Sequence, residues 1–94
     1  MKMYADRARA LVYENYDPEG EYTVEHQEQV GTLRWNSVHI LVVKDQRDRY
    51  WETSYQQGLT ENQDERAFEG ESEVEFGEVR RVPVIKYEFV PVQD

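Results

Sequence analysis

Two stretches of this chain alternate in side-chain character with a period of two residues. From 69 to 76, glutamate occupies every second position, with smaller or apolar residues between. From 21 to 30, apolar and aromatic residues alternate with glutamate, threonine and glutamine, close to strict period two. Successive side chains of a β-strand point to opposite faces of a sheet, so this alternation is typical of strands with one polar face. The pattern predicts antiparallel β-structure.

The composition supports the same fold class. The chain has twelve Val and two Ile but only four Leu and four Ala, a bias toward side chains that suit pleated sheets. Its 94 residues correspond to one domain, which we place at 1–94. It contains no cysteine, which excludes disulfides and thiolate zinc sites and favours a reducing cytoplasm. No apolar run is long enough for a membrane-spanning helix.

We therefore expect an all-β or β-dominated α+β fold, namely a curved antiparallel meander or small barrel of five or six strands with one short helix. Strands are expected at 8–16, at 21–30, within a β-hairpin at 38–55, and as a closing pair at 74–79 and 82–92. The residues 17–20 should form a turn, and Gly31 should mark a bulge. Thr60 is the expected N-cap of a helix near 60–67. The predicted core consists of Val24, Trp35, Ile40, Val42, Trp51, Val84 and Tyr87.

An acidic block from 61 to 78 is the strongest candidate for a functional surface. It holds eight carboxylates against one cation, Arg66, and supplies most of the formal net charge of -9. The predicted partner-binding residues are Glu61, Asp64, Glu65, Glu69, Glu71, Glu73, Glu75 and Glu78. Of these, the four at 69, 71, 73 and 75 would form one negative row if the segment is a strand.

Two interpretations of this block remain open. Residues two apart on a strand are about 6.6 Å apart, whereas each strand of duplex DNA carries one phosphate per roughly 3.4 Å. The row alone is too sparse to imitate DNA, but the remaining acidic residues alongside it would raise the charge density enough for a decoy. The alternative is a solvated strand face that discourages aggregation.

Other chemistry has little support in the sequence. His26 and His39 are the only histidines and form no metal-ligand motif, so we expect no metal and no cofactor. The five glycines are isolated, which leaves no phosphate-binding loop. Aromatic residues interleaved with arginines have the residue types of a nucleic-acid site, but the net charge opposes direct nucleic-acid binding. The sequence offers no recognisable set of nucleophile, base and orienting group, so we do not expect this protein to be an enzyme.

The segment RYWETSYQQGLTENQDE at 49–65, followed by an acidic stretch and a Val- and Tyr-rich end, resembles small acidic hypothetical proteins of actinobacterial bacteriophages. The resemblance covers about a third of the chain. Such phage proteins mostly have no assigned activity, so it implies no catalytic residues. It does imply a protein that binds a host component, and acidic DNA mimics that inhibit host nucleases or defence systems provide an analogy.

We therefore expect a non-catalytic acidic protein-binding domain that inhibits a nucleic-acid-binding or defence protein of the host as a DNA-mimic decoy. Its partner would be a protein with a basic surface, with no direct contact to nucleic acid or membrane, in the host cytoplasm. The alternative is a structural or assembly component, such as a part of the phage particle, that forms a homo-oligomer through strand edges or exposed aromatic residues.

Overall fold

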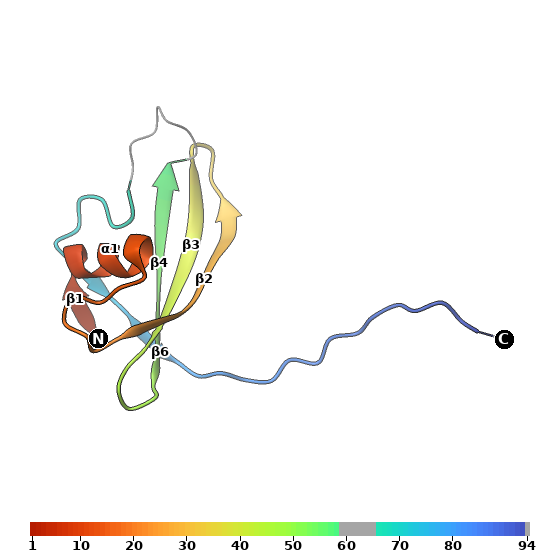
Figure 1. Cartoon of the computed structure of the whole chain (residues 1–94). Helices are drawn as coiled ribbons and strands as arrows, with labels where there is room; N and C mark the ends of the chain where they lie inside the picture. The colour runs from red at the N-terminus through yellow and green to blue at the C-terminus, as the bar shows by residue number, and fades with distance from the viewer. Residues whose placement is uncertain (59–65, 94) are drawn as a thin grey trace.

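The structure is a computed structural model that describes residues 1–58 and 66–93. Its elements are β1 (Lys2–Tyr4), α1 (Ala5–Glu14), β2 (Thr23–Thr32), β3 (Asn36–Lys44), β4 (Tyr50–Gly58), β5 (Glu73–Glu75) and β6 (Gly77–Val79). Strands β2, β3, β4 and β6 form one antiparallel sheet in this order, and β1 pairs with β5 in a second (Figure 1). The prediction of a β-dominated antiparallel fold with one short helix is confirmed, and neither of these sheets closes into a barrel.

The predicted hairpin at 38–55 forms the centre of the larger sheet. Strands β3 and β4 pair in continuous register from Asn36 opposite Gly58 to Lys44 opposite Tyr50. On β2, the register shifts between Gln29 and Gly31, which confirms the predicted bulge. The turn before β2 also forms as predicted, because the Gly20 amide donates to the Asp17 carbonyl at 3.0 Å.

The predicted strand at 8–16 is wrong, because most of this segment belongs to helix α1. Ala5, Ala8 and Leu11 recur every three residues and are almost fully buried, so they form the face of the helix that packs on the sheet. Asp6 lies in the first turn, where the helix dipole favours a negative charge. The helix ends at Glu14, and its C-cap Asn15 adopts a left-handed conformation with φ 52°.

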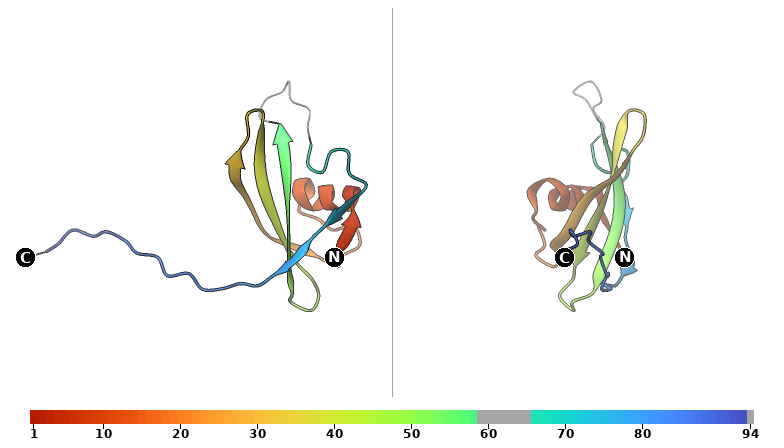
Figure 2. Two further views of the ribbon diagram at one scale, coloured as in Figure 1. Left: turned by 180° about the vertical axis from the view of Figure 1, so that it is seen from behind. Right: turned by 90° about the vertical axis from the view of Figure 1, so that its right-hand side faces the viewer.

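The core lies between α1, the hairpin and the segment around β5. Leu41 and Val43 of β3 and Phe76 next to β5 are no more than 1% exposed. Helix α1 covers only one face of the four-stranded sheet, as the edge-on view of Figure 2 shows. The described residues contain no helix with the length and apolar character needed to cross a membrane.

The predicted core is only partly correct. Val24 and Trp51 are partly buried against the core, whereas Ile40 and Val42 are half-buried on the opposite side of β3. Trp35 is 55% exposed because it lies in the β2–β3 turn. Val84 and Tyr87 are 73% and 89% exposed, because residues 80–93 form no strand and run away from the domain (Figure 1).

The predicted strand at 82–92 is therefore also wrong. Of the predicted helix near 60–67, residues 60–65 and the proposed cap Thr60 lie outside the described residues, and Ala67 lies in a turn.

Candidate interaction surface

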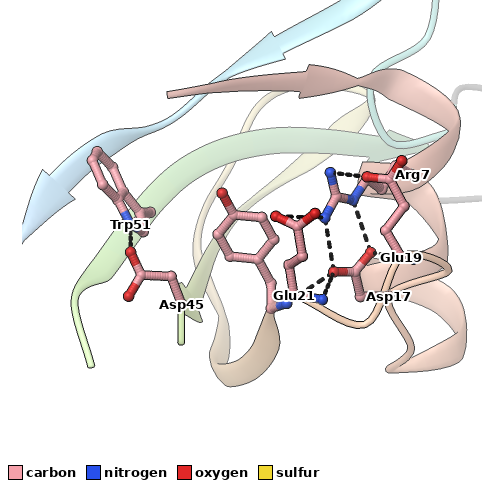
Figure 3. Close-up of polar contacts among 7 residues, drawn as sticks. Arg7, Asp17, Glu19, Glu21, Asp45 and Trp51 are labelled. Atoms are coloured by element: carbon pink, nitrogen blue, oxygen red, sulfur yellow. Dashed lines mark hydrogen bonds and ion pairs between the residues drawn. The ribbon is translucent and has the colours of Figure 1, made fainter. Parts of the chain in front are cut away.

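The acidic residues that the structure describes fall into two groups, those with a cationic partner and those without one. The first group includes a cluster around Asp17, at the turn between α1 and β2. The Arg7 guanidinium donates two hydrogen bonds to the Asp17 carboxylate, at 2.8 and 2.9 Å (Figure 3). The backbone amides of Glu19, Glu21 and Tyr22 donate to the same carboxylate. Glu19 and Glu21 also pair with Arg7.

The Asp17 side chain is only 1% exposed. Burial by itself raises the pKa of this carboxyl, but the Arg7 hydrogen bonds and the three amide donors lower it more. The net result is a pKa far below the usual range, so Asp17 is ionised at neutral pH. Its hydrogen-bonding capacity is occupied by Arg7 and the backbone, which makes the cluster a structural tie between α1 and β2 rather than a catalytic base.

A second acidic side chain organises the β3–β4 loop. The Asp45 carboxylate accepts a hydrogen bond from the Trp51 indole at 3.0 Å (Figure 3) and others from the backbone amides of Arg47 and Arg49. These donors, with Trp51 first, lower the pKa of Asp45 to about 2. Asp45 therefore also has a structural role.

The predicted partner-binding residues lie differently. Glu61, Asp64 and Glu65 are outside the described residues. The other five, Glu69, Glu71, Glu73, Glu75 and Glu78, are all exposed, and none forms an ion pair with another described residue. We call these five residues the acidic surface.

The acidic surface is not a single strand face. Glu69 and Glu71 lie in the turns that precede β5, where Phe68 and Gly70 have positive φ values of 60° and 78°. Only Glu73 and Glu75 share a face of β5, and the buried Val74 lies between them. Lys2 of β1 is in register with Glu75, which places one cation near the end of the row. The strand geometry predicted for the whole row is therefore wrong for its first half.

A surface hollow of about 580 Å³ opens next to Glu73. Strand β1, helix α1 and the turn at 17–20 line it, through residues that include Lys2, Tyr4, Asp6, Arg7 and Glu19. Both charge signs are present in its lining, so the hollow favours neither a purely anionic nor a purely cationic ligand.

The histidines are used within the sheet. His39 stacks on Tyr55 with ring centroids 5.1 Å apart and hydrogen-bonds to the Ser37 hydroxyl. His26 contacts the Glu28 carboxylate at 2.9 Å. Over residues 1–58 and 66–93, no group of three or more potential ligands could hold a metal ion.

The aromatic and arginine residues do not gather into one surface. Tyr55 is buried in the core, while Arg34 lies over Trp35, Arg49 over Trp51 and Arg81 over Tyr50. These separate cation–π pairs differ from a stacking platform for nucleic acid, in which aromatic faces are free to accept bases.

Sequence reasoning missed a second exposed surface at the C-terminal segment. Seven large apolar residues between 82 and 92 are more than half exposed. The alternation of this segment carries the signal, but from the sequence alone it predicts a strand of the domain's own sheet.

Comparison with protein-family models, curated proteins and solved structures finds no match to this chain. Its function must be argued from the two surfaces themselves.

Proposed function

We propose that this protein is a non-catalytic binding domain whose acidic surface docks on a basic surface of a partner protein. The supporting observation is the separation of its carboxylates. Arg7, Lys44 and Arg49 pair with acidic residues outside the acidic surface, whereas the five residues of the acidic surface are exposed and have no cationic partner among the described residues.

Exposed carboxylates without an ion pair in their own chain are available to pair with the cations of a partner. The net charge of -9 steers a basic protein toward the domain and repels nucleic acid and anionic membranes. The acidic residues at 61, 64 and 65 continue the block in the sequence. The absence of cysteine fits a site of action in a reducing cytoplasm.

The narrower proposal is a phage inhibitor that acts as a DNA-mimic decoy on a nucleic-acid-binding or defence protein of the host. It rests on the resemblance of residues 49–65 to phage proteins and on the charge of the block. The break of the row before β5 weakens a strict match to phosphate spacing, so competition with DNA is the feature that distinguishes a decoy from a general acidic docking surface.

The proposal can be tested by affinity capture from a bacterial lysate with wild type and two charge-reversed variants. The first variant carries Glu71→Lys, Glu73→Lys and Glu75→Lys. The matched control carries Glu14→Lys, Asp48→Lys and Glu88→Lys, which changes the net charge equally at exposed positions outside the acidic surface and away from the β2 edge. Captured proteins are identified, purified and titrated with each variant at low and high salt.

We expect the first variant to lose its partner and the control to retain it with a modest reduction in association rate. Wild-type affinity should fall with added salt, because exposed charges are screened over about 8 Å at physiological ionic strength. A decoy should in addition be displaced by duplex DNA. Equal loss in both variants would indicate non-specific attraction, and retention in both would reject the acidic surface as the binding site.

A further inference from the structure

The C-terminal segment is rich in apolar residues and is exposed along its whole length. Between Val82, which is 55% exposed, and Val92, which is 91% exposed, lie five further exposed apolar residues, and Phe89 is fully exposed. Residues 82–93 form no hydrogen bond or ion pair with the rest of the described chain. Single exposed apolar residues are normal, but a contiguous set of this kind marks an interaction site. We call residues 82–92 the C-terminal arm.

The arm has the pattern of a strand with one apolar face. Its odd-numbered positions are entirely apolar or aromatic, namely Pro83, Ile85, Tyr87, Phe89 and Pro91. Its even-numbered positions include both charged residues, namely Val82, Val84, Lys86, Glu88, Val90 and Val92. In an extended conformation the two sets point to opposite sides, so one side is suited to burial.

The two prolines identify which edge of the arm can pair. The N–H groups of odd-numbered residues point to one edge of a strand and those of even-numbered residues to the other. Both Pro83 and Pro91 are odd-numbered, so the even edge keeps all of its donors and the odd edge lacks two. Such a strand can pair with a sheet through its even edge. Its odd edge, which lacks two donors, would then form the outer edge of that sheet.

The domain itself offers a suitable edge. Strand β2 has ten residues and pairs with β3, and its other edge has no strand beside it within residues 1–58 and 66–93. The eleven residues of the arm match this length. A neutral strand is discouraged from pairing at this edge by the two bulges of β2 and by the charges of Glu25 and Glu28. The root of the arm carries Arg80 and Arg81, whose charges complement these carboxylates.

One contact within the chain shows this complementarity directly. The Arg81 guanidinium lies 3.9 Å from the Glu25 carboxylate of β2. The two faces of β2 differ in accessibility: on one, the Gln27 side chain donates to the carbonyls of Leu11 and Val12, so α1 lies against it. The opposite face is open and presents the partly exposed Val38, Ile40 and Val42 of β3. The apolar side of an added strand would share this open face, next to His26 and Glu28 of β2 and two strands from the β3 residues.

We propose that the arm adds as a fifth strand to the β2 edge of a second copy of this chain, with Ile85, Tyr87 and Phe89 directed to the open face of the sheet. A second copy is favoured over the same domain because the arm passes the base of the sheet and runs away from it, as Figure 1 and the left view of Figure 2 show. In a two-fold dimer both arms exchange, so each β2 edge is covered once.

Sedimentation of the full chain over a range of concentrations tests the proposal with matched pairs of variants. Ile85→Lys with Phe89→Lys changes the apolar side, and Val84→Lys with Val90→Lys adds the same charge to the other side. We expect the dimer dissociation constant of the first pair to rise about tenfold or more, a change that sedimentation resolves. The second pair should remain within about threefold of wild type.

A second comparison tests backbone pairing. Lys86→Pro with Glu88→Pro removes two donors from the even edge, and Lys86→Ala with Glu88→Ala removes the same side chains but keeps the donors. The proline pair should abolish the dimer and the alanine pair should keep it. Hydrogen exchange should show protection of 82–92 and of β2 that increases with protein concentration.

Three results would overturn the proposal. One is a monomer at all concentrations up to about 1 mM, the range of weak association. Another is protection of the arm that does not depend on concentration, which would indicate docking on its own domain. The third is a dimer that survives Ile85→Lys with Phe89→Lys and also the proline pair, but is lost on Glu73→Lys with Glu75→Lys. This result would place the contact at the acidic surface.

Discussion

At the scale of single residues, Asp17 connects helix α1 to the chain that enters β2. Its carboxylate holds Arg7 of α1 and the amides that lead into β2, and it has almost no contact with water. A buried carboxylate is stable only if its charge is compensated and its lone pairs are occupied, and both conditions are met here.

Replacement of Asp17 by Ala should destabilise the domain strongly. Loss of one partner from a buried pair leaves an uncompensated charge and unsatisfied amides, at a cost of about 3 kcal/mol in the free energy of unfolding. This estimate is at the lower end of the range because Arg7 retains Glu19 and Glu21. Urea unfolding measures the change. Glu19→Gln is the control, and its exposed side chain should contribute less than about 1 kcal/mol. Equal effects of the two substitutions would contradict a structural role of the buried pair.

The lowered pKa values predict sensitivity to acid. Folding lowers the pKa of Asp45 to about 2 and that of Asp17 further below its usual range. Their stabilisation is therefore complete above about pH 4, where both groups are also ionised in the unfolded chain. It is lost as the pH falls through the folded-state values.

We expect the free energy of unfolding to fall between pH 4 and pH 2, more steeply in wild type than in Asp45→Asn. Urea unfolding at several pH values gives both slopes. Asp48→Asn is a matched control in the same loop, because Asp48 is 86% exposed at its side chain and Asn tolerates its positive φ. Asp48→Asn should retain the wild-type slope, and identical slopes in all three proteins would exclude Asp45 as a source of the pH dependence.

At the scale of elements, the hairpin β3–β4 carries the packing of the domain. Leu41 and Val43 project from β3 toward α1, and Tyr55 of β4 packs on Phe68 with ring centroids 5.5 Å apart. The residues of β3 that alternate with these, Val38, Ile40 and Val42, face the open side of the sheet. A single strand thus separates the hydrophobic core from the surface that we assign to the arm of a second copy.

Truncation of Leu41 and Trp35 should therefore have different effects. Leu41→Ala creates a cavity in the core and should reduce the free energy of unfolding by about 2 to 5 kcal/mol. Trp35→Ala removes a larger side chain, but one that is 55% exposed and contacts Arg34, and should cost less than about 1 kcal/mol. Chemical denaturation of both variants checks this. A larger loss for Trp35→Ala would show that the β2–β3 turn is buried in solution, by an oligomeric contact for example.

At the scale of the whole molecule, the chain divides into a folded domain and an extended arm. The arm accounts for the long dimension of 61 Å in the principal-axis extents of 61 × 40 × 20 Å, as Figure 1 shows. The acidic surface and the β2 edge belong to different parts of the domain, so binding of a basic partner and exchange of arms need not compete.

Deletion of residues 82–94 should leave the folded domain intact. The residues 82–93 make no hydrogen bond or ion pair with the rest of the described chain, so their removal should change the melting temperature by only a few degrees, less than the shift that about 1 kcal/mol causes in a domain of this size. The measurement is made at a concentration at which wild type is monomeric. Collapse of the truncated chain would show that the arm contributes to the fold of its own domain.

The sequence by itself determined the class of fold, the hairpin, the turn at 17–20 and the bulge at Gly31, because alternation and turn residues act over a few positions. It did not identify α1, since the spacing of Ala5, Ala8 and Leu11 competes locally with the strand-forming Val12 and Tyr13, and only packing on the sheet decides between the two conformations.

The tertiary structure also decided which carboxylates are neutralised. Arg7 reaches Asp17 across ten positions and Lys44 reaches Glu25 across a strand pair, so charge counts along the chain cannot separate structural from exposed acidic residues. For the arm, an alternating pattern shows that a segment can form a strand, but the strand that it pairs with depends on the position of the whole segment in space.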